Sequence, residues 1–198
     1  MTTKSTNPNR WRTIDIVIAS VIAVAFGVIF WAWDAVWAAT ENAFLFFPPA
    51  QAILYGMWFL PAVLSGLIIR KPGAAFFTET VAAIISALLG NKWGATVIIQ
   101  GAAQGLGAEL AFALFRYRVF TLPTGLLAGF LAGLVAAVFD WYVWTYTYAL
   151  WNYRVPYALF TVVSATVLAG AGAWLLVRAL APTGVLDRFE AGRERALI

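Results

Sequence analysis

The segment LPTGLLAGFLAGLVAAVFDWYVW, residues Leu122–Trp144, has the length and composition of a helix that crosses a membrane. A helix needs about 20 mainly apolar residues to span the roughly 30 Å hydrocarbon core of a bilayer. The only charged residue in the segment is Asp140, which lies near the end of the run. The segment therefore predicts a transmembrane helix that carries a carboxylate in apolar surroundings.

The rest of the chain has the same character. Of its 198 residues, 63% are hydrophobic and 11% are charged, whereas about a quarter of the residues in a soluble domain are charged. We therefore expect an all-α, polytopic membrane protein, with a single integral-membrane domain over residues 1–198 that forms a six-transmembrane-helix bundle. The predicted spans are residues Thr13–Trp33, Gln51–Ile69, Ala74–Leu89, Gly94–Phe115, Leu122–Trp144 and Tyr157–Leu180.

The lysines and arginines predict how the bundle is inserted. Only Lys92 and Arg154 fall in loops on one side of the membrane. The basic residues on the other side are Lys4, Arg10, Arg12, Arg70, Lys71, Arg116, Arg118, Arg178, Arg188, Arg193 and Arg195. Because cytoplasmic loops are enriched in lysine and arginine, we expect a multi-pass protein of the cell membrane with both termini in the cytoplasm.

Composition also excludes several classes of function. The chain contains no cysteine and no histidine, so it lacks the commonest general base and the commonest zinc ligands. We expect no catalytic set, no metal site and no cofactor. The net charge of +4 does not indicate nucleic acid as a partner, because the basic residues lie at span ends, where membrane topology requires them.

Four polar side chains, Glu79, Gln100, Gln104 and Asp140, lie inside predicted spans. An acidic side chain at mid-bilayer costs roughly 2.5–3.5 kcal/mol, so such groups face one another, a water-filled cavity or a ligand. At about 1.5 Å per residue, these four and Trp58 lie in the outer half of the bundle, where they could line one cavity open to the outside. The alternative is a hydrogen-bond network, for example between Glu79 and Gln104, that only ties the helices together.

A cavity of this composition favours one class of ligand. Carboxylates and amides bind the edge of a planar amine, and Trp or Tyr rings stack on it or hold a cation. The absence of a lysine or arginine from the predicted lining makes an anion a poor fit. The pattern indicates a flat, nitrogen-bearing small molecule that is neutral or cationic.

Aromatic residues crowd the predicted outer ends of the spans. Most of them are typical of a membrane-interface belt, and a few could roof the cavity. The longest outer loop, residues 34–50, is unusually apolar around Phe44–Pro49. This segment could fold onto the bundle as a lid, or lie at the membrane interface.

Glu109 differs from the other intramembrane carboxylates because it lies nearer the cytoplasm. It shares a helix face with Gly101 and Gly105, and Arg116 follows two turns later. We interpret Glu109 as an ion-pair or coupling residue rather than a ligand contact.

Small residues at every fourth position predict close contact between helices. Gly129 and Gly133 belong to such a stripe in the fifth span, and we expect this stripe, like that in the fourth span, to pack internally. The stripe of Ala19, Ala23 and Gly27 in the first span could pack internally or dock another membrane protein.

Several short blocks of the sequence, which follow one another in a fixed order, resemble those of a known family. They are densest between Arg70 and Tyr117. The blocks are Arg70-Lys71-Pro72-Gly73-Ala74-Ala75, Glu79, Leu88-Leu89-Gly90-Asn91, Gly94-Ala95-Thr96-Val97-Ile98, Gln104-Gly105-Leu106-Gly107-Ala108-Glu109, Arg116-Tyr117, Asp140-Trp141-Tyr142 and Thr183-Gly184-Val185-Leu186. In their order and spacing they resemble the YkoE-type substrate-binding S components of energy-coupling factor (ECF) vitamin transporters.

The resemblance implies a six-helix protein that binds thiamine or its hydroxymethylpyrimidine (HMP) precursor from outside. It also implies partners, namely a transmembrane T component and two cytoplasmic ATPase subunits that supply the energy. Many S components dock the T component through a small-xxx-small pattern on the first helix, and Ala19 and Ala23 match this pattern.

The resemblance favours several residues as functional. The residues that lie in the matching motifs are Glu79, Asn91, Gln104, Glu109 and Asp140. With Gln100, Trp58, Trp141 and Tyr142 added from the depth and aromatic arguments, the predicted substrate-binding set is Glu79, Gln100, Gln104, Asp140, Trp58, Asn91, Trp141 and Tyr142.

Three other functions remain open at this point. One is an S component for another small nitrogen heterocycle, since the sequence does not separate thiamine from HMP or from similar rings. A second is an intramembrane enzyme that uses Glu79 and Asp140 as acid and base. A third is a channel, in which the polar residues would line a continuous path.

Overall fold

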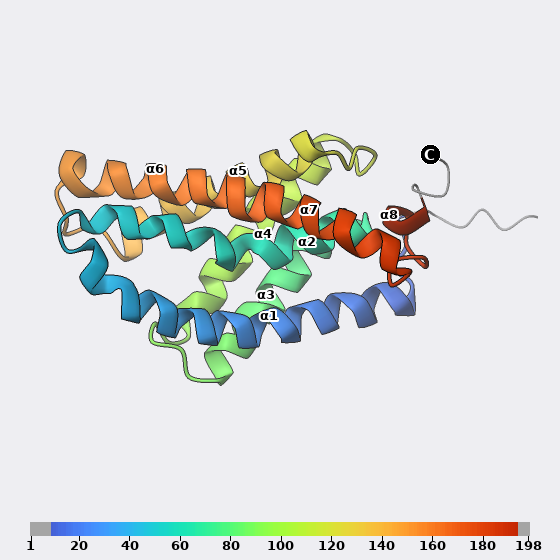
Figure 1. Ribbon diagram of the computed structural model, residues 1–198, viewed down its shortest axis with the longest axis horizontal. Helices are drawn as coiled ribbons and strands as arrows, with labels where there is room; N and C mark the ends of the chain where they lie inside the picture. Colours follow the sequence, from blue (N-terminus) through green and yellow to red (C-terminus); the bar gives the residue numbers. More distant parts are fainter. Residues whose placement is uncertain (1–8, 194–198) are drawn as a thin grey trace, which may run out of the picture.

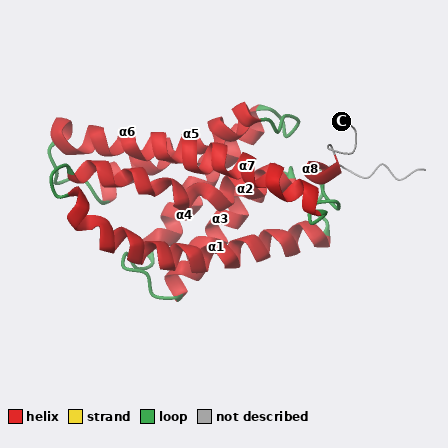
Figure 2. Cartoon of the chain, viewed as in Figure 1, coloured by secondary structure: helices red, strands yellow, loops and turns green. Residues whose placement is uncertain are grey.

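The computed structural model describes residues 9–193, and the predicted basic residues Lys4 and Arg195 lie outside this range. Within it the chain is built of helices and loops, with no strand (Figure 2). The α-helices are α1 Thr13–Thr40, α2 Leu60–Ile69, α3 Ala74–Leu88, α4 Thr96–Leu114, α5 Leu122–Val143, α6 Val155–Ser164, α7 Gly172–Leu180 and α8 Glu190–Arg193. The 3-10 helices are η1 Glu41–Phe44, η2 Pro48–Phe59 and η5 Ala181–Thr183, and the π-helical segments are η3 Leu150–Arg154 and η4 Ala165–Ala171.

Five helical stretches of the described chain are long and apolar enough to cross a membrane. They are Thr13–Phe44, Pro48–Ile69, Thr96–Leu114, Leu122–Val143 and Leu150–Thr183. Helix α3 is apolar but has only 15 residues. The all-helical membrane architecture predicted from the sequence is therefore confirmed, with five candidate spans by length and composition.

Two predicted boundaries need correction. The first helix does not end at Trp33 but continues to Thr40, because residues 34–40 contain no proline or glycine to stop it. The last helical stretch begins at Leu150 rather than Tyr157, and its first turn is π-helical. The apolar loop expected over residues 34–50 is correspondingly short.

The bundle is elongated, and its two ends are told apart by the path of α1 (Figure 1). Helix α1 starts at the end where α7 and α8 finish, on the right of the view, and runs to the opposite end. We call the first end, with Arg12, Lys71 and Arg178, the basic end, and the other, with Trp37 and Trp144, the aromatic end. At the basic end, Lys71 contacts the start of α1, donating through Nζ to the Arg10 carbonyl oxygen at 2.7 Å.

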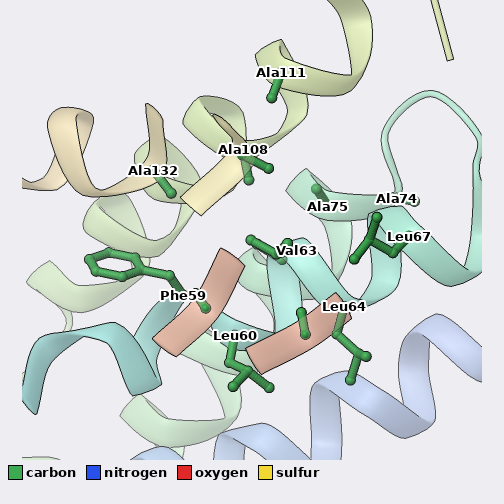
Figure 3. Packing of buried hydrophobic residues seen from close by; sticks show 14 of the residues in the cluster. Phe59, Leu60, Val63, Leu64, Leu67, Ala74, Ala75, Ala108, Ala111 and Ala132 are labelled. Atoms are coloured by element: carbon green, nitrogen blue, oxygen red, sulfur yellow. The ribbon is translucent and has the colours of Figure 1, made fainter. Parts of the chain in front are cut away.

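Helix α2 lies at the centre of the bundle, and all ten of its residues are buried. Its Val63 and Leu67 pack with Phe59 from η2 and with alanines from α3, α4 and α5, such as Ala108 and Ala132 (Figure 3). Alanine at these positions lets backbones approach closely where no hydrophobic effect drives helices together in lipid.

The glycine stripes of α4 and α5 pack inside the chain, as predicted. A Cβ at Gly101 would lie 2.5 Å from the Cβ of Ala83 on α3, and one at Gly129 would lie 2.4 Å from the Ala165 carbonyl oxygen. These contacts are closer than any side chain permits, so the two glycines allow α4 to meet α3, and α5 to meet η4.

The stripe on α1 also packs internally, which is one of the two alternatives that the sequence left open for Ala19 and Ala23, and docking through them stays a prediction. Both alanines are 0% exposed, and a Cβ at the next stripe position, Gly27, would lie 2.5 Å from the Cβ of Ile85 on α3. A partner could reach these residues only by separating α1 from the bundle. The surface that α1 offers outward is instead formed by exposed residues such as Val17 and Val21.

Ser164 fixes the unusual 3-10 helix η2 against α6. Its hydroxyl accepts a hydrogen bond from the Gly56 backbone N–H at 2.8 Å and donates to the Ile53 carbonyl oxygen. Gly56 has no room for a side chain, because a Cβ there would lie 2.4 Å from the Ser164 carbonyl oxygen. Runs of 3-10 helix longer than three or four residues are uncommon. The hydrogen bonds to Ser164 therefore help to stabilise η2, which its own backbone hydrogen bonds stabilise only weakly.

Candidate functional site

A cavity of about 270 Å³ opens at the aromatic end of the bundle. It lies among α1, η2, α3, α4 and the connection between α5 and α6. Its lining residues are Phe30, Asp34, Trp37, Tyr55, Trp58, Glu79, Ala83, Ser86, Asn91, Trp93, Val97, Gln100, Gly101, Gln104, Trp144, Thr145, Tyr148, Tyr153 and Tyr157. Five of the predicted substrate-binding residues are therefore together in one cavity, namely Glu79, Gln100, Gln104, Trp58 and Asn91.

Glu79 reaches the cavity from α3 and uses only part of its hydrogen-bonding capacity. Its side chain is 1% exposed, and Oε2 accepts from the Ala62 backbone N–H at 3.1 Å. Ala62 lies in the first turn of α2, just after the 3-10 helix η2 passes into it. Oε1 is buried and has no partner within residues 9–193. One oxygen is thus held by the protein while the other remains available inside a cavity.

Asp140 positions Gln100 from behind the cavity wall. Asp140 is fully buried, and its Oδ1 accepts from Gln100 Nε2 at 2.7 Å while its Oδ2 accepts from the Tyr157 hydroxyl at 2.8 Å. Gln100 Nε2 also donates to the Tyr55 hydroxyl, and its Oε1 accepts from Trp144 Nε1 at 3.3 Å. The amide of Gln100 is therefore held in one orientation by groups from three other segments.

Gln104 and Asn91 present polar groups that the described chain does not satisfy. Gln104 is 4% exposed and makes no side-chain hydrogen bond within residues 9–193. Asn91 Oδ1 accepts from the Trp93 backbone N–H at 2.8 Å, but its buried Nδ2 has no partner in the same range. An unsatisfied buried polar group such as Asn91 Nδ2 is rare in proteins, and both Asn91 and Gln104 line the same cavity as the unpartnered oxygen of Glu79.

Aromatic rings form another wall of the cavity. The Trp58 ring centroid lies 5.4 Å from that of Trp37, 5.5 Å from that of Trp93 and 5.3 Å from that of Tyr55. Rings at these separations support one another and offer faces and edges to a planar or cationic guest.

Asp34 is a cavity residue that the sequence interpretation missed. Its side chain lines the cavity beside Trp58, and its buried Oδ2 has no partner among the described residues. The sequence predicted a loop at this position, because the first span was expected to end at Trp33. A single carboxylate within a run of alanine, valine and tryptophan was the signal that could have revealed it.

Comparisons with known proteins show the family to which this chain belongs. The family described as "ABC-type cobalt transport system, permease component" matches residues 14–135. The permease protein YkoE of Bacillus subtilis (strain 168), named for HMP and thiamine, is 35% identical over 184 residues, covering 93% of this chain and 92% of YkoE. A crystal structure of an S component of an ECF transporter is 34% identical, covers 94% of both chains and gives a TM-score of 0.88.

The chain belongs to the YkoE-type S components of ECF transporters. The resemblance seen in the sequence is confirmed. The S component is accordingly a transport protein rather than an enzyme, and a multi-pass protein of the plasma membrane.

Two residues of this S component that were predicted to bind the substrate, Trp141 and Tyr142, lie away from its cavity. Trp141 carries the Arg154 guanidinium 4.3 Å above its ring centroid, and Tyr142 is 75% exposed. Neither lines the cavity. Each step along a helix turns the side chain by about 100°, so the inward position of Asp140 directs its next two neighbours elsewhere.

The apolar segment Phe44–Pro49 of the S component does not cover the cavity. Leu45 and Phe46 are exposed, and Phe47 packs edge-on against Phe160 with ring centroids 6.3 Å apart. None of these residues lines the cavity. The position matches the interfacial alternative rather than a closed lid.

Glu109 lies outside the cavity of the S component and caps the N-terminus of α3. Its carboxylate accepts from the backbone N–H groups of Gly73, Ala75 and Phe76 at 2.6, 2.9 and 3.2 Å, and from the Tyr117 hydroxyl at 2.8 Å. Gly73, the N-cap residue, has no side chain with which to cap the helix, so α4 supplies the acceptor. Burial and the neighbouring Glu109 raise the pKa of the Tyr117 hydroxyl well above its usual range, which keeps it a donor.

These four donors refine the interpretation of Glu109. Glu109 joins α4 to the start of α3 through backbone N–H groups and through the Tyr117 hydroxyl, rather than through Arg116. Both oxygens of Glu109 are already in use, so the arrangement suits a structural contact.

Proposed function

We propose that the chain is the substrate-binding subunit of an importer for thiamine or HMP, and that the cavity at the aromatic end is the binding site. The free Oε1 of Glu79, buried at the wall of a polar and aromatic cavity, is the observation that carries the proposal. The name of the relative YkoE, an HMP/thiamine permease, supports the ligand class.

The donors and acceptors of the cavity match an aminopyrimidine. A carboxylate oxygen accepts from an exocyclic amine, and the amide of Gln104 offers both a donor and an acceptor to the ring edge. Asn91 Nδ2 adds a second unsatisfied donor. In thiamine, the cationic thiazolium would lie against the aromatic wall formed by Trp58 and its neighbours. Asp140 acts indirectly by holding Gln100, and Trp141 and Tyr142 are left out of the site.

Cavity size favours a small ligand. The volume of about 270 Å³ is near the lower end of the roughly 300–1,000 Å³ typical of ligand pockets. Another small nitrogen heterocycle is therefore the second candidate. A metal ion fits less well, even though the matching family description names cobalt, because the chain has no histidine or cysteine and residues 9–193 hold no group of three acidic side chains suited to a metal.

The acid–base enzyme suggested by Glu79 and Asp140 has little support from the geometry. Asp140 is fully buried and absent from the cavity lining, where Gln100 and Tyr157 occupy its two oxygens. Only Glu79 of this pair would meet a substrate in the cavity.

We infer a topology of six spans in one membrane domain, with α3 as the sixth. At about 1.5 Å per residue, its 15 residues extend about 22 Å, and packing among α1, α2 and α4 supports this shorter crossing. The basic end holds Arg12, Arg70, Lys71, Arg116 and Arg178. By the positive-inside rule it faces the cytoplasm together with both termini, which opens the cavity to the outside.

The implied partners are an ECF T component and two cytoplasmic ATPase subunits. We propose these partners because the chain belongs to the S-component family. Ala19 and Ala23 are buried, so docking through them would require α1 to move away from the bundle.

The test is isothermal titration of the purified, full-length chain in detergent with thiamine and with HMP. We expect one of them to bind without ATP, and Glu79→Gln to weaken binding by about tenfold or more, since a hydrogen bond to a charged group contributes about 1.5–3 kcal/mol. Glu41→Gln is the matched control, because Glu41 is an exposed carboxylate at the same end that pairs with Lys92. If folded wild-type protein binds neither compound, the proposed substrate class is wrong.

A further inference from the structure

The carboxylate of Asp34 reaches the same cavity as that of Glu79 and is not needed to hold the amine edge of a pyrimidine. Asp34 is 7% exposed, and its buried Oδ2 has no partner within residues 9–193. An acidic side chain inside an apolar span is costly unless it meets another polar group, water or a ligand. Asp34 therefore has a capacity for binding that the described chain does not use.

Asp34 and Glu79 lie at different depths of the cavity. Helix α1 crosses α3 where a Cβ at Gly27 would lie 2.5 Å from that of Ile85. Asp34 follows Gly27 by about two turns toward the aromatic end, at about 3.6 residues per turn. Glu79 precedes Ile85 by more than one turn, on the side of the basic end. Asp34 is therefore the outer carboxylate of the cavity, and Glu79 is the inner one.

Three tryptophans, Trp37, Trp58 and Trp93, share the cavity wall with Asp34. The ring centroid of Trp37 lies 5.4 Å from that of Trp58 and 6.3 Å from that of Trp93, and the last two are 5.5 Å apart. Trp37 follows Asp34 by three residues, so both lie on one face of α1. Aromatic faces attract a cation, and the carboxylate of Asp34 adds an acidic group at the same place.

The described chain places no cation of its own in this group. No lysine or arginine of residues 9–193 lines the cavity. Lys92 lies near enough to act on Asp34 electrostatically, but its Nζ donates to Glu41 Oε1 at 2.8 Å and lies 4.9 Å from the Trp93 ring centroid. The outer part of the cavity thus combines a carboxylate with aromatic rings and leaves the place of a cation open.

We propose that Asp34 is the counter-ion for a positive charge on the ligand, and that it makes the cavity favour a cationic ring over a neutral one. This inference rests on the proposed binding of an aminopyrimidine and extends it. Glu79 accepts from the amine edge deeper in the cavity, while Asp34 and the tryptophans hold the cation nearer the mouth. In thiamine the cation is the thiazolium ring, which HMP lacks.

A purely structural role for Asp34 has less support. Glu109 shows the structural arrangement in this protein, because its two oxygens accept from four donors of the chain. Asp34 Oδ2 accepts from none within residues 9–193. Asp34→Asn should therefore remove the charge and leave the melting temperature within experimental error.

The proposal is tested by isothermal titration of the full-length chain in detergent with two ligands. One is thiamine, and the other is its thiophene analogue, in which carbon replaces the charged ring nitrogen. Wild-type protein should bind thiamine about tenfold or more tightly than the analogue, as expected for one contact with a charged group away from water. Asp34→Asn should weaken thiamine binding by about tenfold and leave binding of the analogue unchanged.

Two further variants are compared with Asp34→Asn. Glu79→Gln should weaken both ligands by similar factors, because both carry the same pyrimidine. Glu41→Gln is the matched control, since it removes an exposed carboxylate just beyond the end of α1, and it should change neither affinity.

Three results would overturn the proposal. Wild-type protein could bind the two ligands equally well, Asp34→Asn could weaken both alike, or Glu79→Gln rather than Asp34→Asn could abolish the preference for the charged ring. In each case an aminopyrimidine still binds, so the proposed function stands. The comparison of the two ligands on wild-type protein decides the matter if Asp34→Asn does not fold. If folded wild-type protein binds neither thiamine nor HMP, both the proposed function and the role of Asp34 are wrong.

Discussion

Glu79 and Glu109 are buried carboxylates that do the same local task in two regions of the molecule, with different outcomes. Each comes from one helix and accepts hydrogen bonds from the N-terminus of another, α2 for Glu79 and α3 for Glu109. Glu109 accepts from four donors, whereas Glu79 accepts from one and keeps a buried oxygen without a described partner. The number of donors that the protein itself supplies, rather than burial or charge, separates a structural carboxylate from one available to a ligand.

The largest effect on stability should come from removing Glu109, whose carboxylate already accepts four hydrogen bonds. Glu109→Ala leaves three backbone N–H groups at the start of α3 and the Tyr117 hydroxyl without their acceptor, and each buried unsatisfied group costs about 1–3 kcal/mol. We expect a loss of about 3 kcal/mol or more in the free energy of unfolding, measured by thermal or denaturant unfolding in detergent. Glu79→Gln should cost less than about 1 kcal/mol, because the amide oxygen can still accept from Ala62. Equal losses in the two variants would remove the distinction between the two sites.

The second prediction concerns the group that holds Gln100. Asp140→Asn places an amide N–H₂ against either Gln100 Nε2 or the Tyr157 hydroxyl, so one hydrogen bond is lost or reversed. We expect ligand affinity to fall by about tenfold, since a hydrogen bond to a charged group contributes about 1.5–3 kcal/mol, and calorimetric titration would measure this. Glu41→Gln again serves as the control. Unchanged affinity would show that the orientation of Gln100 does not matter to the cavity.

A smaller effect should follow from Gln104→Leu. Gln104 makes no described hydrogen bond within the protein, so its replacement should leave the free energy of unfolding unchanged or slightly improved. Ligand affinity should fall by about fivefold, the equivalent of one neutral hydrogen bond of about 1 kcal/mol. A marked loss of stability with intact ligand binding would instead place Gln104 with the structural groups.

The smallest effect should come from Tyr117→Phe, which removes one of the four donors to Glu109. We expect a loss of about 1 kcal/mol in the free energy of unfolding and no change in ligand affinity. The raised pKa of the Tyr117 hydroxyl means that its contribution is complete below the usual tyrosine pKa of about 10 and is lost as pH rises toward the higher folded-state pKa. The difference in stability between wild type and Tyr117→Phe should therefore narrow above about pH 10. A constant difference across that range would argue against the hydroxyl bond to Glu109.

Several features of the fold could be predicted from the sequence because they depend on local properties. The apolar runs around α4 and α5 placed those helices within a few residues, since bilayer thickness sets their length. Glycine spacing identified close packing at Gly101 and Gly129. Counting residues along the spans also separated Glu109 from Glu79, because depth in a helix follows from a constant rise per residue.

Other features depended on the rotation of each helix, which the sequence pattern left ambiguous. The alanine stripe of α1 could face either the bundle or a partner, and only packing against α3 showed that Ala19 and Ala23 are internal. Asp34 was assigned to a loop because the first span was expected to end at Trp33, although residues 34–40 contain no proline or glycine to stop the helix. Trp141 was included for its depth and its aromatic ring, although the helix turns it away from the cavity.

The sequence by itself determined that this protein is a helical membrane protein with polar groups gathered at one level of the bundle, because the cost of burying a charge in lipid leaves few alternatives. Only the tertiary structure decided which of those groups are satisfied. Hydrogen bonds such as those from Gly73 to Glu109, or from Gln100 to Asp140, join residues 36 and 40 positions apart. Such partners are chosen by the relative rotation, depth and spacing of several helices at once, and these are set by non-local packing rather than by the residues of any one segment.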